Sequence, residues 1–593
     1  MPDNIRDHRD HRGEPPPPRQ PPPEPPSQPP PVVRDHRGEP PPPSQPSPEV
    51  RDHRGEAPSR PAPEHDEQPG FGDVVRDHRT SGIKHIFVLM LENRSFDHML
   101  GFSGITGTDA KTGQPTAIEG LTGSESNQVG DQVYGVVTGA ADVMGTGPAH
   151  NFLDVLEQLC GADATYTSGQ AYPTQITNSG FASSYESLAG PGSGGEAMKC
   201  FASDRLPVLN ALAREFVVCD HWFSSMPGPT EPNRMFVHAA TSGAFDDSPS
   251  NTEIGESILL PDSGIAFKHG TIFKLLDDAG VKYRIYADDH FPNVAELHDV
   301  SVWSIQEFEN FADDLNDDDF DASYVFIEPS YDALDTYDDG NSQHPNGSVA
   351  AGERFIKATY EAIRQSPLWP SSLLVITWDE HGGFYDHAPP PPAVPTGSVG
   401  RDHGFTFAQL GPRVPAIVVS PLIPRNLIEH RVFDHAAIPA TLERVFNLPS
   451  SLTSRDGGNG VNNLATLSTP RTDAPVTLPE PTAAAVAAQR LPLSETVARQ
   501  PGALVANDRH GNVAGLIRSA VAQHLKVAPA AEHEAILEQA KQLRTHADVQ
   551  AYLQEVHIAV TAVRTSGAAV VPMTARDRIR TGPARRLGSS ADS

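Results

Sequence analysis

The part of the chain that follows Ile83 alternates short apolar runs with longer amphipathic stretches. HIFVLML, SSLLVITW and RVPAIVVSPLI are rich in β-branched residues, and KYRIYADDH and ASYVFIEPS share this character. Between these runs, GTIFKLLDDAG and VAAGERFIKATYEAIRQSP space their apolar residues as a helix does. Strands that alternate with helices predict an α/β fold over residues 82–470, an α/β/α sandwich with a mainly parallel sheet.

Several of the apolar runs end in residues that carry chemistry. In parallel sheets, ligands bind beyond the carboxyl ends of the strands. We therefore expect the polar groups that follow the runs to lie along one edge of the sheet. These groups are Glu92-Asn93, Asp288-Asp289-His290 and Asp379-Glu380-His381.

The two ends of the chain differ from this middle part. Residues 1–81 repeat the unit RDHRGEPPPP and hold many of the 58 prolines, a composition typical of an extended, disordered arm. This arm is interpreted as a tether or as a docking tract for a protein partner; metal binding is the weakest interpretation, since arginines flank its histidines. Residues 471–593 read as a Pro/Thr-rich linker and a small helical region without evident chemistry.

Charge and composition restrict the classes of partner that the chain can bind. The net charge of −31 argues against nucleic acid, because a nucleic-acid binder needs a basic face, and it disfavours simple docking on anionic lipid. A bound metal could still attract a phosphate-containing substrate. Three cysteines make no disulfide framework, and neither an export signal nor a transmembrane segment is visible. We expect a cytoplasmic protein by default, with secretion by another route left open.

Two acidic pairs are candidate metal ligands. Glu92 and Asn93 offer hard oxygen ligands directly after a strand, although alone they read better as helix or turn caps. The neighbouring carboxylates of Asp379 and Glu380 repel each other unless a cation lies between them. The two glycines that follow allow the backbone to approach something closely. Because both pairs are predicted at one sheet edge, a metal site is the better interpretation.

A third motif, SMPGPTEPNR, supplies a candidate nucleophile. Thr230 is expected at the start of a helix, where unpaired N–H groups favour an anion. A hydroxyl beside a divalent metal can lose its proton and attack phosphorus. Asn233 and Arg234 are suited to holding phosphate oxygens. The alternative for an isolated threonine is a simple N-cap.

Three long motifs together resemble the bacterial phospholipase C and acid phosphatase phosphoesterase family, which belongs to the alkaline-phosphatase-like superfamily. They are IKHIFVLMLENRSFDHMLG, CDHWFSSMPGPTEPNR and VITWDEHGGFYDHAPPP, and the resemblance extends from Ile83 to Leu448. LPVLNALAREFVVCD, FIEPSY and FDHAAIPATLERVF agree with it.

The resemblance implies roles for particular residues. Glu92, Asn93, Asp379 and Glu380 match the family's metal ligands, and Thr230 matches its nucleophile, which also lies at the metal. One divalent ion is implied, and calcium, zinc, manganese and iron stay open. Histidines near the phosphate and leaving group are implied as well, for which the candidates are His150, His290 and His344; the roles of His381, His387 and His435 stay open.

The expected function follows from this resemblance. We expect hydrolysis of phosphate esters through a phospho-threonine intermediate, first of all phospholipase C-type cleavage of phospholipids. A broad-specificity acid phosphatase acting on small phosphate esters is the first alternative. A non-catalytic scaffold that works through the Pro-rich arm is the second.

Overall fold

The computed structural model describes residues 82–248, 264–481 and 512–566, apart from 336, 338, 450 and 459. These residues belong to one unit, Asp77–Ser593. The predicted Pro-rich arm, residues 1–81, lies outside the described residues. The boundaries of the three predicted regions therefore stay predictions.

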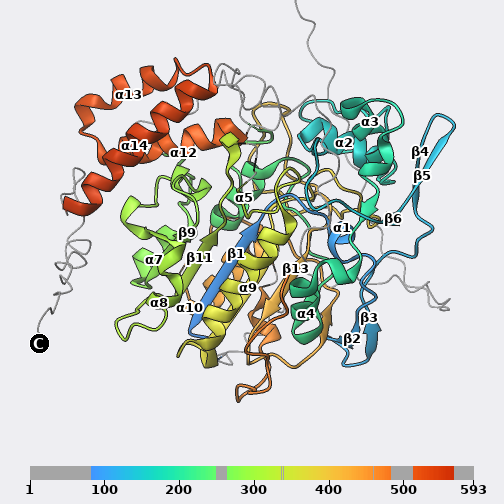
Figure 1. The fold of residues 1–593 in the computed structure, drawn as a ribbon, viewed down its shortest axis with the longest axis horizontal. Helices are drawn as coiled ribbons and strands as arrows, with labels where there is room; N and C mark the ends of the chain where they lie inside the picture. Colours follow the sequence, from blue (N-terminus) through green and yellow to red (C-terminus); the bar gives the residue numbers. More distant parts are fainter. Residues whose placement is uncertain are drawn as a thin grey trace, which may run out of the picture. The chain divides into compact units, whose positions relative to one another are not determined.

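A ten-stranded sheet forms the centre of the fold (Figure 1). Its strands follow the order β10-β9-β11-β1-β12-β13-β8-β14-β2-β3. β13 and β3 run antiparallel to their neighbours, and the other strands all run in one direction. The predicted α/β fold with a mainly parallel sheet is confirmed. The strands of this sheet are β1 (His85–Leu91), β2 (Thr106–Asp109), β3 (Pro115–Ala117), β8 (Val217–Cys219), β9 (Tyr283–Ala287), β10 (Ile305–Glu307), β11 (Tyr324–Glu328), β12 (Ser372–Trp378), β13 (Ala416–Val419) and β14 (Leu427–Glu429).

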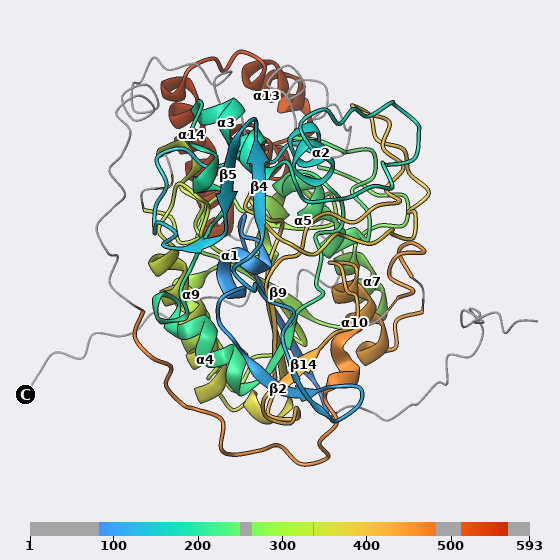
Figure 2. The ribbon, with the colours of Figure 1, turned by 90° about the vertical axis from the view of Figure 1, so that its right-hand side faces the viewer.

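Helices cover both faces of the sheet. Figure 2 shows α4 and α9 on one side and α7 and α10 on the other. The sequence accounts for the two helices that were predicted: Ser348 caps α9, Thr271 caps α7, and Gly280 with φ 72° ends α7. The helices around the sheet are α1 (Phe96–Leu100), α2 (Phe152–Cys160), α3 (Phe181–Ala189), α4 (Pro207–Glu215), α5 (Thr230–Ala239), α7 (Ile272–Ala279), α8 (Phe311–Asp314), α9 (Val349–Gln365) and α10 (Ala437–Phe446).

The central strands are buried on both sides, as their continuous apolar runs indicate. Residues 86–91 of β1 are at most 1% exposed. Short two-stranded ribbons stand apart from the main sheet. They are β4 (Ser126–Val129) with β5 (Gln132–Gly135), and β6 (Val137–Thr138) with β7 (Lys199–Cys200).

The C-terminal helices pack directly on the part that carries the sheet. They are α12 (Asn512–Val527), α13 (His533–Ala540) and α14 (His546–Ser566). Arg518 of α12 is 3% exposed and forms ion pairs with Glu231 and, at 2.9 Å, with Glu296. Lys526 donates to the carbonyls of Ala295 and Leu297 at 2.7 and 2.8 Å. The helical character was predicted correctly, but the docking next to α5 was not foreseen.

The Pro/Thr-rich segment before these helices is more than a linker over the residues that the structure describes. Arg471 pairs with Glu215 of α4 at 2.6 Å. Tyr360 of α9 donates to the carbonyl of Pro475 at 2.6 Å.

No helix among the described residues combines the length and the apolar character that a membrane crossing requires.

Candidate active site

Two polar pairs leave the sheet side by side. β1 and β12 are parallel neighbours in which Leu91 lies opposite Trp378, so Glu92-Asn93 and Asp379-Glu380 begin at the same level. The backbone N–H of Asn93 donates to Asp379 Oδ1 at 2.9 Å, and the N–H of Glu380 donates to the same oxygen at 2.7 Å. The four side chains are at most 2% exposed. The structure therefore brings together the four residues that were predicted as metal ligands.

A close backbone approach joins the two loops that carry these pairs. Asn93 has φ 59° and Gly382 has φ 65°, both in the left-handed region. A Cβ atom at Gly382 would lie 2.0 Å from the carbonyl oxygen of Asn93, so only glycine fits there. The glycines that follow Asp379-Glu380 thus have the role that the sequence predicted.

Thr230 faces the two pairs from a different element. It is the first residue of α5, and its hydroxyl donates to Asn93 Oδ1 at 2.9 Å. The loop before it is held by Asn233, whose amide accepts from Met226 N–H at 3.1 Å and donates to the Gly228 carbonyl at 3.0 Å. Asn233 was predicted to hold phosphate oxygens; its amide is instead used within this loop.

The orientation of the Asn93 amide decides whether these residues can surround a cation. The terminal atom of the Asn93 amide that faces the site lies 3.1 Å from Asp379 Oδ1, 2.8 Å from Glu380 Oε1 and 2.9 Å from Thr230 Oγ1. The other terminal atom lies 3.5 Å from His150 Nε2. If nitrogen faces the carboxylates, it donates hydrogen bonds to them. If oxygen faces them, four oxygens converge, which is stable only around a cation.

Two further observations favour the arrangement with oxygen facing the site. His150 Nδ1 lies 3.1 Å from the Pro148 carbonyl and must donate to it, so Nε2 of the neutral ring holds a lone pair that accepts from the Asn93 nitrogen. In addition, Glu92 Oε2 is buried without a hydrogen-bond partner among the described residues. The residues present therefore fit a divalent metal.

The electrostatics of the cation-free cluster agree with this fit. Burial raises the pKa of Glu92 to about 8, and the neighbouring Asp379 carboxylate adds to the increase. Burial and Asp379 also raise the pKa of Glu380 well above its ordinary value. Three carboxyl groups at one buried point cannot all be ionised unless positive charge balances them.

Arg234 supplies part of that positive charge. Its Nε donates to Asp379 Oδ2 at 2.9 Å, and Nη2 donates to the Leu91 carbonyl at 3.1 Å. The Glu328 carboxylate lies 4.0 Å from Nη1, and the guanidinium lies over the ring of Tyr331. Arg234 was predicted as a phosphate ligand; its Nε and Nη2 are used by Asp379 and the end of β1, its Nη1 makes no hydrogen bond among the described residues, and the phosphate role stays a prediction.

Two of the three predicted catalytic histidines meet beside this cluster. The rings of His150 and His344 lie 6.5 Å apart, and both residues are buried. His150 Nε2 is 3.9 Å from Glu380 Oε1. His344 Nδ1 accepts from the N–H of Asn346 at 3.3 Å, so the proton of the neutral ring sits on Nε2. The two histidines therefore have opposite tautomers: His150 Nε2 has a lone pair that can accept a proton, and His344 Nε2 has an N–H that can donate a hydrogen bond.

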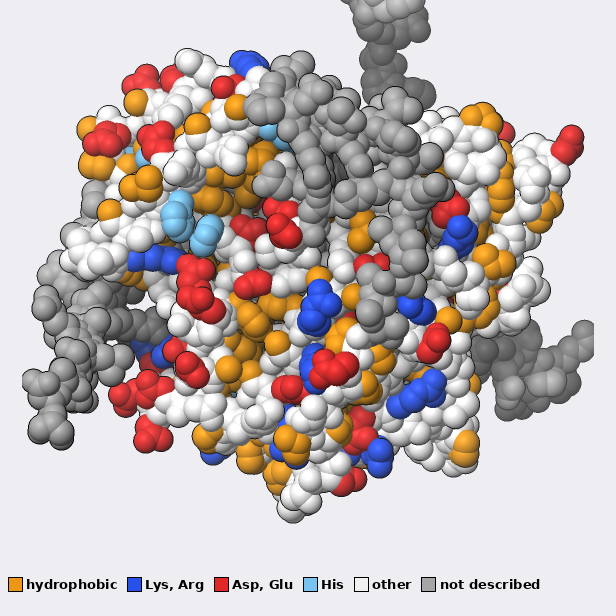
Figure 3. Space-filling model, in the orientation of Figure 1, with side chains coloured by type: hydrophobic (Ala, Val, Ile, Leu, Met, Phe, Trp, Pro, Cys, Tyr) orange, Lys and Arg blue, Asp and Glu red, His pale blue; other side chains and the backbone are white. Residues whose placement is uncertain are grey.

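His290 lies in a different environment. Its side chain is 59% exposed and is 3.9 Å from Glu307, and its ring lies 4.3 Å from that of His557 of α14. Figure 3 shows histidine side chains (pale blue) exposed where the C-terminal helices meet the part that carries the sheet. His290 follows β9 as predicted, but its described contacts include none of the buried cluster. We therefore do not assign it a catalytic role.

The remaining histidines of the motifs have structural partners. Burial lowers the pKa of His435 to about 4, and its Nε2 lies 2.6 Å from the Asp379 carbonyl. His381 Nε2 lies 2.7 Å from Gln158 Oε1. His387 Nδ1 lies 2.6 Å from Asp97 Oδ2. These contacts hold the loop after β12 in place.

Some residues of the site were not found from the sequence. Glu328 ends β11, which is the other neighbour of β1, and Tyr331 follows it. A small cavity beside Glu92 and Thr230 is lined by Tyr331 and also by Leu516 of α12. The strand pattern marked the Glu328 segment without distinguishing that residue. Nothing in the pattern connected Leu516 with a site more than two hundred residues earlier.

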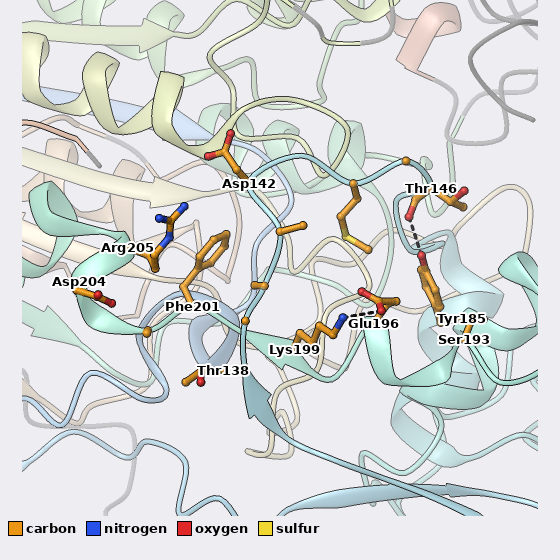
Figure 4. A pocket seen from close by; sticks show the side chains of 16 residues that line it. Thr138, Asp142, Thr146, Tyr185, Ser193, Glu196, Lys199, Phe201, Asp204 and Arg205 are labelled. Atoms are coloured by element: carbon orange, nitrogen blue, oxygen red, sulfur yellow. Dashed lines mark hydrogen bonds and ion pairs between the residues drawn. The ribbon is translucent and has the colours of Figure 1, made fainter. Parts of the chain in front are cut away.

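A larger cavity of about 840 Å³ lies outside this cluster (Figure 4). Lys199 pairs there with Glu196 at 2.6 Å, and Tyr185 donates to the Thr146 carbonyl at 2.9 Å. None of the clustered acids or Thr230 lines this cavity. The candidate catalytic groups therefore lie at the end of β1 and β12 and not in this cavity.

Comparison with known proteins identifies the family of the chain. The non-specific phospholipase C3 of Arabidopsis thaliana is 34% identical, over 68% of this chain and 76% of its own length. The non-specific phospholipase C6 of the same plant is 36% identical, over 68% and 75%. A solved structure of a protein in the alkaline phosphatase superfamily from Vibrio parahaemolyticus aligns with 60% of this chain and 72% of that one, at 13% identity and a TM-score of 0.27. The model of the Phosphoesterase family matches residues 83–449, so the chain belongs to this family.

Proposed function

We propose that this chain is a metal-dependent phosphoesterase that cleaves phospholipids in a phospholipase C-type reaction. The observation that carries the proposal is the position of Thr230. Its hydroxyl lies at the N-terminus of α5 and 2.9 Å from Asn93, between the two strand-end pairs. A hydroxyl nucleophile, a set of oxygen ligands and two histidines are the groups that such a reaction needs. The names of the two Arabidopsis relatives support the choice of substrate.

The metal would be held by Glu92, Asn93, Asp379 and Glu380, with Thr230 beside it. When bound, a divalent cation supplies positive charge that favours loss of a proton from a neighbouring hydroxyl and offsets the charge of the phosphate. All the donor atoms are oxygens, which favours a hard cation such as calcium or manganese.

The proposed reaction has two halves. In the first, Thr230 Oγ bonds to phosphorus while the bond from phosphorus to the diacylglycerol oxygen breaks. The Thr230 proton passes to His150 Nε2, which then gives it to the departing oxygen, and the neutral His344 ring donates a hydrogen bond from Nε2 to the same oxygen. In the second, water bonds to phosphorus and gives its proton to His150. The bond to Thr230 breaks, and His150 returns a proton to Oγ. Diacylglycerol and the phosphorylated headgroup are the products.

Replacement of the nucleophile tests the proposal. We expect Thr230→Ala to lose at least about 10³-fold in turnover, because the covalent route is closed. The matched control Thr230→Ser keeps a hydroxyl at the same place and should retain measurable turnover. Acid quench of the wild type with substrate labelled in its phosphate should leave label on residue 230 and none on the alanine variant. A fully active Thr230→Ala protein would exclude the mechanism.

A phosphomonoesterase is the second candidate. The small size of the cavity beside Thr230, with Leu516 in its wall, favours a small phosphate ester over a lipid. Purified protein assayed with phosphatidylcholine in detergent micelles and with p-nitrophenyl phosphate, each with and without chelator, separates the two. Turnover of the soluble ester alone would select the phosphomonoesterase, and activity that survives full metal removal would contradict both.

A further inference from the structure

A second group of metal-ligating side chains lies at the same edge of the sheet. β8 and β14 are parallel neighbours in which Cys219 lies opposite Glu429. Asp220 and His221 directly follow β8, and His430 directly follows β14. The same topology that brings the catalytic pairs together therefore brings these three side chains together. The candidate active site does not use any of them.

Their donor atoms are close enough to share one ion. His430 Nδ1 lies 3.0 and 2.9 Å from the two carboxylate oxygens of Asp220, and His221 Nδ1 lies 3.8 Å from Asp220 Oδ1. One donor atom from each residue lies within 4.8 Å of the others. Asp220 is fully buried, whereas the His221 and His430 side chains are 23% and 29% exposed. An ion could thus reach the site from solvent.

The opposite nitrogens of both rings are held by outer partners. His221 Nε2 lies 2.7 Å from Glu119 Oε2, and His430 Nε2 lies 3.0 Å from Thr116 Oγ1. A histidine that binds a metal usually donates its other N–H to a carboxylate or another oxygen, which fixes the ring. This arrangement is present for both histidines. We propose that Asp220, His221 and His430 form a second metal site that takes a zinc ion.

The donor types select the metal. Two imidazole nitrogens and one carboxylate suit zinc, which accepts three protein ligands and leaves a fourth position to water. Donor atoms on one tetrahedral zinc lie about 3.3 Å apart, so the longest separation must shorten through rotation of the partly exposed rings. His221 Nδ1 now donates to the His430 carbonyl at 2.7 Å, and His430 Nδ1 donates to Asp220 at 2.9 Å, so both protons must pass to the buffer when zinc binds.

A neighbouring cluster of ligand-type side chains already contains a positive charge. Asp97, Asp386 and His387 also bring ligand atoms together. However, Arg413 already lies among them, because its guanidinium donates to Asp386 at 2.8 Å and to Asp97 at 3.0 Å. Positive charge is thus supplied by the protein. No lysine or arginine forms an ion pair with Asp220 among the described residues, so a cation has room to act there.

Zinc stoichiometry tests the proposal on the full chain. After removal of metal, Zn²⁺ is titrated into the wild type and into His221→Gln/His430→Gln, and bound metal is counted by elemental analysis. We expect the double variant to lose one equivalent while phosphoesterase activity is unchanged. His298→Gln is the matched control, since His298 also faces a carboxylate, Asp299, at 3.1 Å. Equal stoichiometry in the wild type and the double variant would overturn the proposal.

A second measurement uses only the unmodified protein, in case the double variant does not fold. Diethyl pyrocarbonate is applied at neutral pH with and without Zn²⁺, and modified histidines are identified by mass spectrometry. We expect Zn²⁺ to suppress modification of His221 and His430 and to leave His298 unchanged. Equal modification of all three in the presence of Zn²⁺ would also overturn the site.

Discussion

The two places where polar residues follow neighbouring strands of the sheet differ in donor type and in burial. At the end of β1 and β12 the donors are oxygens of acids and an amide, and all are at most 2% exposed. At the end of β8 and β14 two imidazoles join one aspartate, and both rings are partly exposed. The topology is the same in both places. The side chains therefore decide which cation suits each place and what it can do.

The surroundings of the two places differ as well. The β1/β12 edge faces Thr230, a hydroxyl at a helix N-terminus, and the pair His150 and His344. At the β8/β14 edge, the outer partners Glu119 and Thr116 fix the rings. We therefore expect phosphoesterase chemistry at the first edge and, at the second, a cation that takes no part in this reaction. The following predictions test this division, beginning with the largest effect.

Loss of a ligand should separate the two edges most clearly. Asp379→Asn removes a carboxylate from the β1/β12 edge, and we expect about 10⁴-fold lower turnover, because metal catalysis contributes several kcal/mol. His430→Gln removes a ligand from the β8/β14 edge and should leave turnover within about twofold. Steady-state kinetics with one substrate measures both. Comparable losses in the two variants would show that the edges act as one site.

The arginines at the two edges should differ in their effect on stability. Arg234 is buried and pairs with Asp379, so Arg234→Met leaves a buried carboxylate without its partner and should cost about 3–5 kcal/mol. Arg431 is 27% exposed, and its partner Glu429 keeps a hydrogen bond from the Arg431 backbone N–H at 2.9 Å, so Arg431→Met should cost less, about 1–3 kcal/mol. Urea unfolding followed by fluorescence compares them. Equal unfolding midpoints for the two variants would show that the two arginines contribute equally to stability, whatever their burial.

The histidines should differ in their dependence on the leaving group. We expect His344→Gln to lower turnover about 10²-fold for an alkyl phosphate, whose leaving oxygen develops more negative charge, and much less for p-nitrophenyl phosphate. His290→Gln and His221→Gln are controls from outside the buried cluster and should change neither rate. A uniform loss on both substrates would assign His344 to structure rather than to stabilisation of the leaving oxygen.

The last expected effect requires no substitution and is a pH dependence confined to the β1/β12 edge. The pKa of Glu92 is raised to about 8 in the cation-free fold. A raised carboxyl pKa stabilises the fold below the ordinary value, and this stabilisation is lost as pH rises from about 4.5 to about 8. Metal-free protein should therefore show a Tm that falls across this interval. With added Mn²⁺ the fall should disappear, and a parallel fall in both samples would contradict this origin.

The residues that could be predicted are those whose position follows from a local pattern. Glu92 and Asp379 come directly after buried apolar runs, and parallel strands place such residues at one edge. Thr230 follows a loop rich in proline and glycine and begins a helix, as expected. In these cases the neighbouring sequence contains the information that fixes the position.

The contacts that were not foreseen join residues distant in sequence. Arg234 was expected to hold phosphate, but its partner Asp379 lies 145 residues away. His290 occupies a strand end as expected, yet its ring meets His557 of a C-terminal helix. Hydrophobic periodicity reports which face of an element is buried, but it does not report what covers that face.

The position of α12 has a consequence for any attempt to divide the chain. The match to the Phosphoesterase family ends at residue 449, yet Arg518 pairs with Glu231, the residue after Thr230. A chain cut at the family boundary would remove the counter-charge of Glu231 and Glu296 and uncover Phe291 and Val302, which pack with the C-terminal helices. Loss of activity in such a fragment would report the loss of these contacts. It would not show whether the catalytic domain can act on its own. A shortened chain made for expression, labelling or grafting therefore has to include α12.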